Sequence, residues 1–169
     1  MLVVGGVAGG ASCAARLRRL DESAEIAVFD RGPFVSFANC GLPYYVGDVI
    51  TDERALIVAS PELFRQRFNI EVHTETEVTA IDRAQSVIRA RDLRTGAGRD
   101  ERYDVLVLSP GAAPIRPLLP GVDLPGIFAV RTIPDSRRIR SWITDHRATT
   151  AVVVGGGFIG LEMVENRRC

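Results

Sequence analysis

The chain has 169 residues, of which 46% are hydrophobic and 25% charged, the composition of an ordinary soluble globular protein. Its 21 basic residues balance 21 acidic ones, so its charge favours neither a nucleic acid nor an acidic membrane surface as partner. No apolar run approaches the roughly 20 residues of a membrane helix, and the first residues lack the pattern of a signal peptide. We therefore expect a cytoplasmic protein that binds neither a membrane nor a nucleic acid.

The first 30 residues have the pattern of a β-α-β unit. Residues 2–4 are a short buried strand, a run of glycines follows, and residues 11–20 form a helix. A second strand covers residues 25–29 and ends at Asp30. A unit of about 30 residues is the length expected for half of a dinucleotide-binding fold.

The middle of the chain alternates turns with short strands. Residues 33–43 are rich in turn formers and precede a short helix, and Ser60 caps a second helix that begins at Pro61. Alternating or apolar runs predict four strands, at residues 68–72, 77–82, 86–91 and 102–108. A glycine-containing stretch at residues 95–98 predicts a hairpin turn between the last two of these strands.

The last third begins with an extended segment, since five of the nine prolines lie between Pro110 and Pro125. Residues 135–144 are predicted to be helical, and residues 151–154 to be a buried strand that runs into a second glycine motif and the start of a helix. A strand, a turn and one helix cannot bury their own faces, because a parallel sheet needs further strands and covering helices. Unless another chain supplies them, we therefore expect this segment to be truncated.

Both glycine runs follow a strand and open a helix. Gly155, Gly157 and Gly160 fit the dinucleotide fingerprint, in which the glycines allow a tight turn, a close approach to pyrophosphate and close helix packing. The first run keeps the fingerprint glycines Gly5 and Gly10 but has Val7 between them. Either run alone could be a plain glycine turn. Asp30, about 25 positions on, could accept hydrogen bonds from ribose hydroxyls or be a solvated acid. Two such sites suggest a flavin and a nicotinamide.

Cys40 is the candidate for redox chemistry. Pro43 lies just beyond it and suits the opening of a helix, whose amide dipoles would favour a thiolate at Cys40. Such a thiolate can attack a disulfide. The alternative is a buried structural cysteine. Cys13 is interpreted as a packing residue and Cys169 as having no role, and three cysteines at these positions fit neither a disulfide framework nor a zinc site.

Four motifs, at residues 4–11, 36–44, 108–112 and 154–162, resemble in order and spacing those of the coenzyme A-disulfide reductases. These are a single-cysteine branch of the FAD-dependent pyridine nucleotide-disulfide oxidoreductases. Dithiol relatives carry a second cysteine where Tyr45 stands, and relatives that reduce oxygen or peroxide usually carry a histidine where Val7 stands. The first departure means that no internal disulfide can form between these two positions, and the second favours a thiol-disulfide substrate over peroxide chemistry.

The resemblance implies the cofactors FAD and NADPH or NADH, and it assigns roles to particular residues. Those that would contact FAD are Gly5, Gly6, Val7, Ala8, Gly9, Gly10, Asp30, Arg31, Val78, Ser109 and Gly111. Those that would contact the nicotinamide nucleotide are Gly155, Gly157 and Gly160. Cys40 would form a mixed disulfide with coenzyme A and Asn39 would hold the reacting sulfur. Residues that would bind coenzyme A disulfide, or a similar small disulfide or persulfide, are Ser12, Arg16, Arg19, Ser36 and Asn39.

The fold class that follows is α/β: a three-layer, Rossmann-like FAD-binding domain built on a parallel sheet with a β-hairpin or meander insertion, then the start of a second Rossmann-like domain for NAD(P). The expected boundaries are 1–115, a connecting segment at 116–148, and 149–169. Complete family members are longer homodimers, and some carry a rhodanese domain, so the chain alone is expected to bind flavin poorly and to be inactive. Two alternatives stay open: an NADH oxidase or peroxidase that uses a sulfenic acid at Cys40, and a non-catalytic truncated product. The arginines of the first helix could instead form an exposed, solvated face.

Overall fold

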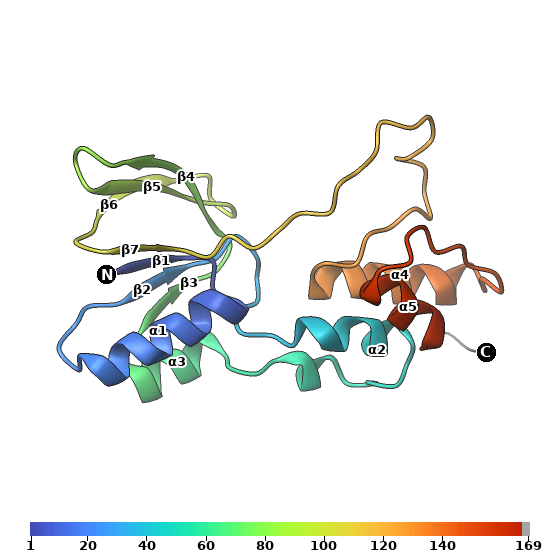
Figure 1. Ribbon diagram of the computed structural model, residues 1–169, viewed down its shortest axis with the longest axis horizontal. Helices are drawn as coiled ribbons and strands as arrows, with labels where there is room; N and C mark the ends of the chain where they lie inside the picture. Colours follow the sequence, from blue (N-terminus) through green and yellow to red (C-terminus); the bar gives the residue numbers. More distant parts are fainter. Residues whose placement is uncertain (167–169) are drawn as a thin grey trace. The chain divides into compact units, whose positions relative to one another are not determined.

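The computed structural model describes residues 1–166, which form two compact units (Figure 1). The first unit comprises Met1–Phe37 and Ile57–Gly111, and the second comprises Ala38–Leu56 and the residues from Ala112 onward. Phe37 and Ile57, which flank residues 38–56, form an isolated antiparallel bridge. The predicted boundaries at 115 and 148 remain predictions.

The first unit is built on a parallel sheet of four short strands in the order β3-β2-β1-β7. The strands are β1 (Leu2–Val4), β2 (Ala27–Phe29), β3 (Glu71–His73) and β7 (Leu106–Leu108). All three pairings are parallel. The strands predicted at residues 2–4 and 25–29 are confirmed, and the one predicted at 68–72 begins three residues later.

An antiparallel sheet of three strands forms a second layer: β4 (Thr76–Asp82), β5 (Val87–Asp92) and β6 (Gly98–Arg102). The hairpin turn predicted near residues 95–98 is confirmed, and it joins β5 to β6. The single strand predicted at 102–108 is wrong, because β6 ends at Arg102 and β7 belongs to the other sheet. Sequence reasoning missed β6 since its residues are polar and mostly exposed, as is usual for an edge strand.

Side-chain alternation along the parallel strands separates three layers, as the sequence predicts. Val3 and Val28 pack with the helices α1 (Ala8–Leu20) and α3 (Pro61–Phe68) in one apolar cluster. Leu2 and Phe29, one residue away on each strand, pack with Ile88 of β5 in another. Successive side chains of a strand point to opposite faces, so each strand serves two cores.

The helix starts reflect local sequence. Ser60 accepts a hydrogen bond from the amide of Leu63 at 3.2 Å and Pro61 opens α3, as predicted. Helix α1 begins at Ala8, three residues before the predicted start. Its first turn contains two glycines, which have low helix propensity and therefore concealed the true beginning.

Arg18 is a buried cation that the sequence did not single out. Only 9% of its surface is exposed, and its guanidinium donates to five backbone carbonyl oxygens, those of Asp21, Glu22, Ala24, Phe68 and Asn69. Arg18 thus ties the end of α1 to the end of α3. The five hydrogen bonds compensate for burying its charge.

His73, at the end of β3, is half-buried against the neighbouring strand. Its ring stacks on Phe29 at a centroid distance of 4.8 Å, and its Nε2 lies 3.3 Å from Glu71 Oε1. Burial lowers the pKa of His73, and Arg99 lowers it further, while Glu71 and Glu101 act in the opposite direction. The unfolded chain therefore binds this proton more readily than the folded one.

We expect the free energy of unfolding to be highest above about pH 6.5, the usual histidine pKa, and to fall as the pH drops toward the lowered pKa of folded His73. Urea titrations of the wild type and His73→Gln between pH 5 and 8 check this. In the variant, the free energy of unfolding should depend less steeply on pH, because the contribution of this histidine is gone. Equal slopes in the two proteins would contradict the prediction.

The second unit contains a 3-10 turn (Asn39–Gly41), helix α2 (Leu42–Val46), a further 3-10 turn (Glu53–Leu56), α4 (Ile133–Asp145) and α5 (Phe158–Glu165). Helix α4, predicted at residues 135–144, is confirmed and packs against α2. Trp142 stacks on His146 at 3.7 Å and meets Phe128 edge-on at 5.8 Å.

The strand predicted at residues 151–154 is wrong, because these described residues pair with no other strand. Val152 and Val154 are 85% and 96% exposed. A strand is stabilised by its neighbours' hydrogen bonds and by burial of both faces, and the second unit offers no neighbouring strand within the described residues.

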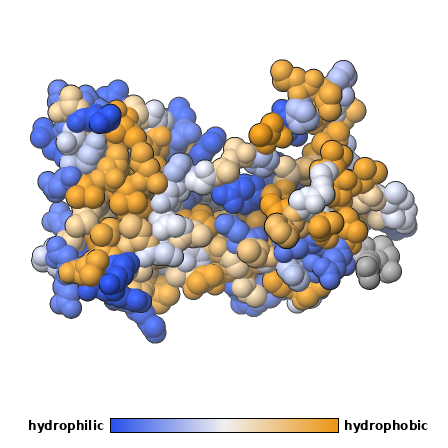
Figure 2. All heavy atoms as spheres, viewed as in Figure 1, coloured by the Kyte–Doolittle hydropathy of each residue, from blue (hydrophilic) through white to orange (hydrophobic). Residues whose placement is uncertain are grey.

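Apolar side chains are also exposed along the segment between β7 and α4, where the sequence predicted an extended run. Figure 2 shows hydrophobic residues along the loop that Figure 1 draws there. Ile115 and Leu118 are 94% and 102% exposed. Within residues 1–166, no helix combines the length and the hydropathy needed to cross a membrane.

Candidate dinucleotide and thiol sites

The carboxyl ends of the parallel strands converge at one edge of the sheet. Strand β1 is central, with β2 on one side and β7 on the other, so the strand order reverses direction at β1. Ligands of open α/β sheets bind at such a switch point. Gly5, Asp30 and Ser109 directly follow β1, β2 and β7, so the structure brings together three residues predicted to contact a cofactor.

The first glycine turn depends on missing side chains. Gly5 has φ +92°, and a Cβ added there would lie 2.0 Å from the carbonyl oxygen of Ser109. A Cβ on Gly10 would lie 1.7 Å from the carbonyl oxygen of Gly5. These are the tight-turn and close-packing roles predicted for the first and third fingerprint glycines. Gly9 differs, because its added Cβ would meet nothing closer than 3.5 Å.

Asp30 is bound to the glycine turn by its carboxylate. It is 8% exposed, and its oxygens accept hydrogen bonds from the amides of Gly6 at 2.6 Å and Gly32 at 2.7 Å. Burial raises the pKa of Asp30, and the two amides oppose that shift. The carboxylate therefore holds the turn in place, a role that sequence reasoning missed. Its predicted ribose contact remains a prediction.

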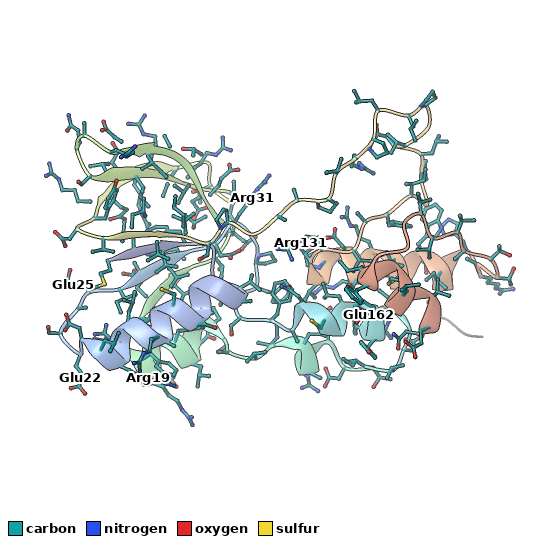
Figure 3. The ribbon with its side chains drawn as sticks, viewed as in Figure 1. Arg19, Glu22, Glu25, Arg31, Arg131 and Glu162 are labelled. Atoms are coloured by element: carbon teal, nitrogen blue, oxygen red, sulfur yellow. The ribbon has the colours of Figure 1, made fainter. Side chains whose placement is uncertain are left out.

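Asp30 also joins the end of β2 to the start of β4 through its backbone. Its amide donates to the carbonyl of His73 and its carbonyl accepts from the amide of Thr76, both at 2.9 Å. Val78, two residues further on, lies where the pairing of β4 with β5 shifts register. Bulges of this kind are frequent beside binding sites. Arg31 lies beyond the end of β2 with its side chain 78% exposed (Figure 3).

The helices that follow the two glycine motifs start differently from α3 and α4, although the short helix α2 also lacks a side-chain cap and an acid in its first turn. Within the described chain, α1 and α5 have no side-chain cap and no acid in their first turns. By contrast, α3 and α4 are capped by Ser60 and Thr132 and carry an acid there. The first amides of α1 and α5 are thus free of side-chain acceptors, which fits the binding of a phosphate group at each.

The second glycine motif repeats the geometry of the first. Gly155 has φ +111°, and a Cβ on Gly160 would lie 2.2 Å from the carbonyl oxygen of Gly155. Gly157, the N-cap of α5, has open space where its Cβ would be. The turn therefore forms although the strand before it does not.

A pocket of about 330 Å³ lies in the first unit between α1 and α3. Ser12 and Ser36, both predicted to contact the substrate, line it. The remaining lining is apolar: Val7, Ala8, Ala11, Ala15, Phe37, Val58, Ala59, Phe64 and Phe68. The pocket therefore combines an apolar wall with two hydroxyl groups.

Arg16 and Arg19 continue the pocket-lining face of α1. They follow Ser12 and Ala15 by four residues each, the spacing of neighbours on one helix face, and both are exposed. Figure 3 labels Arg19 on the outside of the helix. Two cations therefore lie beyond the pocket on the same side of α1.

Ser36 is held in an uncommon backbone conformation, with φ +45°. Its amide donates to the carbonyl of Gly6 at 2.8 Å, and its own carbonyl accepts from Val58 and Ala59. Such strain in a non-glycine residue is frequent at functional sites. These bonds fix Ser36 at the pocket wall.

The turn Asn39–Gly41, in the second unit, presents Cys40 as an exposed free thiol. The alternative of a buried structural cysteine is therefore wrong. The turn leads directly into α2, where Pro43 stands in the first turn as predicted. Among residues 1–166, Asn39 Oδ1 is buried and has no hydrogen-bond partner, which is uncommon for a buried polar atom. Cys13 is half-buried in α1, and Cys169 lies outside the described residues.

No group of three or more metal-ligating side chains occurs within residues 1–166. Two uncapped helix starts after glycine turns, at a sheet switch point and at a second motif, are typical of proteins that bind dinucleotides. The family model for pyridine nucleotide-disulphide oxidoreductases matches residues 1–166. The chain belongs to this family of oxidoreductase enzymes.

The chain is similar to coenzyme A disulfide reductases and their neighbours. It is 42% identical over 166 residues to the coenzyme A disulfide reductase of Staphylococcus epidermidis, which covers 98% of the chain and 37% of the relative. Among solved structures, reduced CoADR-RHD of Bacillus anthracis is 49% identical with a TM-score of 0.95, covering 98% of this chain and 30% of that one.

Two further similar structures are of proteins named for other activities. The NAD-dependent persulfide reductase of A. fulgidus is 35% identical with a TM-score of 0.91, covering 98% of this chain and 31% of that one. The water-forming NADH oxidase of Lactobacillus brevis is 30% identical with a TM-score of 0.89, covering 98% and 36%.

The chain thus spans about 37% of the length of the curated relative. The predicted cofactor classes, FAD with NADH or NADPH, and the predicted fold class are confirmed at the level of the family.

Proposed function

We propose that the chain forms part of an enzyme that reduces coenzyme A disulfide, or a similar small disulfide or persulfide, with Cys40 as the attacking thiol. The observation that carries the proposal is the pocket lined by both Ser12 and Ser36, with two exposed arginines beyond it on the same face of α1. The similarity to coenzyme A disulfide reductases supports this substrate class.

The residues present fit two nucleotide cofactors. FAD would be held by the turn at Gly5–Gly10 with the open start of α1, together with Asp30, Arg31, the backbone near Val78, and the turn at Ser109–Gly111. The open start of α5 with Gly155, Gly157 and Gly160 would hold NADH or NADPH. The chemistry that these cofactors supply is a pair of electrons for reducing a disulfide.

The pocket suits the slender arm of coenzyme A. Its apolar wall would cover the methylene and dimethyl groups of a pantetheine chain, while Ser12 and Ser36 would pair with the amides of that chain. Arg16 and Arg19 would meet the phosphates, for which a planar guanidinium is well suited. Phe37 lines the pocket, and Cys40 follows it by three residues in the chain.

The chemical step assigned to Cys40 is thiol-disulfide exchange. The Cys40 thiolate attacks one sulfur of the substrate, the substrate S–S bond breaks, and one coenzyme A thiolate leaves with the bonding electron pair. The product is a mixed disulfide between Cys40 and the second coenzyme A. Asn39, which precedes Cys40 in the same turn, would help hold the reacting sulfur.

The test compares two disulfides that differ in their phosphates. Coenzyme A disulfide and pantethine, which lacks the nucleotide, are each reacted with the chain, and the mixed disulfide on the Cys40 peptide is followed by mass spectrometry. The double variant Arg16→Gln/Arg19→Gln should react about tenfold more slowly with coenzyme A disulfide, the equivalent of roughly 1.4 kcal/mol. Its rate with pantethine should be unchanged.

Arg83→Gln is the matched control, since Arg83 is an exposed arginine of the same unit in the turn after β4. It should change neither rate. If the double variant reacts with both disulfides as the wild type does, the arginines form a solvated helix face and the coenzyme A proposal loses its specificity argument.

Because a water-forming NADH oxidase is among the similar structures, the same assay should also test the oxidase alternative. A chain that forms a sulfenic acid at Cys40 with peroxide faster than it forms a mixed disulfide with coenzyme A disulfide would favour that reading. Reaction with neither would favour a non-catalytic product. A homodimer and a cytoplasmic location remain part of the proposal.

A further inference from the structure

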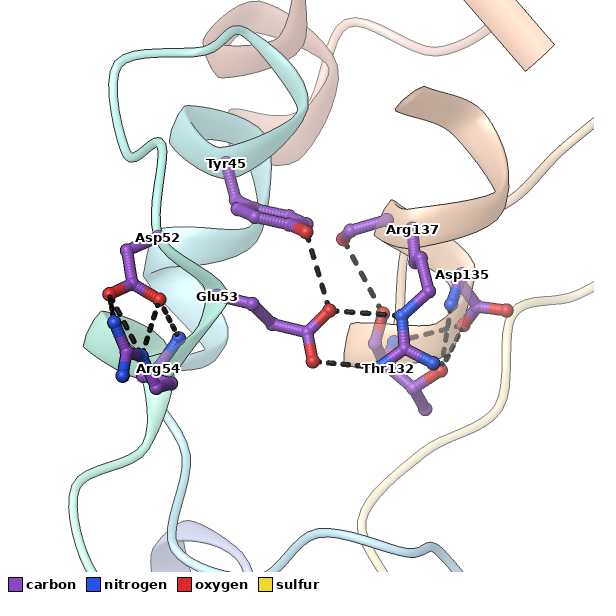
Figure 4. A network of polar contacts seen from close by, with 8 residues as sticks. Tyr45, Asp52, Glu53, Arg54, Thr132, Asp135 and Arg137 are labelled. Carbon is purple, nitrogen blue, oxygen red and sulfur yellow. Dashed lines mark hydrogen bonds and ion pairs between the residues drawn. The ribbon is translucent and has the colours of Figure 1, made fainter. Parts of the chain in front are cut away.

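A network of polar contacts joins the segment that carries Cys40 to helix α4. The guanidinium of Arg137 binds both oxygens of Glu53, at 2.6 and 3.0 Å, and the hydroxyl of Tyr45 donates to the same carboxylate at 3.3 Å (Figure 4). The neighbouring Asp52 and Arg54 pair with each other. Of the three charged residues 52–54, Glu53 is therefore the one that binds α4.

A second arginine of α4 holds Tyr45 by its ring. The guanidinium of Arg140 lies 4.2 Å from the centre of that ring, and it also pairs with Asp48 just after α2. Tyr45 is only 7% exposed. One aromatic residue of α2 is thus fixed at its hydroxyl and at its face, both by arginines one helical turn apart on α4.

The anchored tyrosine and the thiol belong to one continuous helical stretch. The turn Asn39–Gly41 runs without interruption into α2, Leu42–Val46. A short helix has little stability of its own, so the orientation of this stretch depends on its contacts. Rotation or fraying of α2 would move Cys40 with it.

Helix α4 is a firm support for these contacts. Its start is fixed by a capping box between Thr132 and Asp135, and Ile133 and Ser136 are fully buried. Arg137 and Arg140 lie on the face that also includes these buried residues, at spacings of three and four. The hydrogen bond from Arg137 is the main reason that the pKa of Glu53 is lowered, so the carboxylate is charged and available to both partners at neutral pH.

We propose that Arg137 and Arg140 are positioning residues for Cys40, acting through Glu53 and Tyr45. They need not touch the substrate: they hold α2, and so the thiol, in the orientation in which it attacks a bulky disulfide. The inference rests on the proposed function in one respect, that Cys40 is the attacking thiol.

The experiment compares Arg137→Gln with Arg138→Gln. Arg138 is the adjacent residue of α4 and pairs with Asp135 of its own helix, so it is a matched control. Amide hydrogen exchange of residues 39–46 is measured in each variant, together with the rates at which Cys40 reacts with iodoacetamide and with coenzyme A disulfide. The exchange of α1 serves as an internal reference.

In Arg137→Gln we expect exchange at residues 39–46 to accelerate at least about tenfold while α1 is unchanged. Mixed-disulfide formation should slow about fivefold, because orientation is lost, whereas the iodoacetamide rate should stay within about twofold, because a small reagent needs no docking. Arg138→Gln should resemble the wild type. Faster exchange throughout both units would mean general unfolding of Arg137→Gln. In that case Tyr45→Phe, which removes only one hydroxyl, replaces it as the test variant. It should accelerate exchange at residues 39–46 and slow mixed-disulfide formation, each by a smaller factor.

Unchanged exchange at residues 39–46 in Arg137→Gln, or equal effects from Arg138→Gln, would overturn the inference. Failure of the proposed function looks different: the wild type itself would form no mixed disulfide with coenzyme A disulfide, while the exchange measurements would still show whether α4 holds the Cys40 turn.

Discussion

Cys40→Ser is expected to abolish formation of the coenzyme A mixed disulfide, lowering its rate at least about a thousandfold, the scale on which loss of a nucleophile acts. A serine hydroxyl is not ionised at neutral pH and does not exchange with a disulfide, whereas a thiolate does. The exposed position of Cys40 in its turn makes it accessible to the reagent. Peptide mass mapping after reaction with coenzyme A disulfide measures the adduct at this site.

Cys13→Ser is the control for that experiment. Cys13 is also a free thiol, half-buried in α1, so its loss should leave the adduct on Cys40 undiminished. If the serine variant at position 40 still yields the same adduct on another thiol at the wild-type rate, Cys40 is not the attacking residue. In a flavin-loaded enzyme that contains this chain, disulfide-dependent oxidation of NADH or NADPH should fall by the same factor.

Gly10→Ala is expected to destabilise the first unit by at least about 3 kcal/mol, the upper range for overpacking. Its Cβ would lie 1.7 Å from the carbonyl oxygen of Gly5, and backbone atoms cannot move aside as a flexible side chain can. The turn that links β1 to α1 would have to open, and the hydrogen bond from Gly6 to Asp30 would open with it. Urea unfolding followed by circular dichroism measures the loss.

The adjacent glycine, Gly9, provides a control variant that should not lose stability. Gly9 also lies in the first turn of α1, but an added Cβ there would be 3.5 Å or more from its nearest neighbours. Alanine exceeds glycine in helix propensity by up to about 1 kcal/mol, so Gly9→Ala should leave stability unchanged or raise it. Similar losses in both variants would show that helix geometry, and not the contact with Gly5, constrains this turn.

Local sequence was sufficient for the features that depend on a few consecutive residues. Both glycine turns have the predicted form, and the turn at Gly155 keeps it even though the strand before it is unpaired. The cap at Ser60 and the proline start of α2 were also readable. In each case the backbone conformation is set by residues within one helical turn, so no distant partner is needed.

Strands, whose formation depends on residues far apart in the chain, were predicted correctly only in some cases. Strands with apolar side chains, such as β1 and β2, were predicted correctly, but the polar edge strand β6 was missed. The strand expected at residues 151–154 does not form. An apolar run signals that a segment can be buried, but whether it becomes a strand depends on neighbours that the run itself does not specify.

The sequence by itself determined the class of protein: two glycine turns that each open a helix, an acid after the second strand, and one thiol before a short helix. Only the tertiary structure decided that Asp30 holds the first turn by its carboxylate, that Ser12 and Ser36 share one pocket, and that Arg137 reaches Glu53. The physical reason is that a turn is fixed by the torsion angles of adjacent residues. A pocket or an ion pair, in contrast, exists only where packing brings together residues that are far apart in the chain.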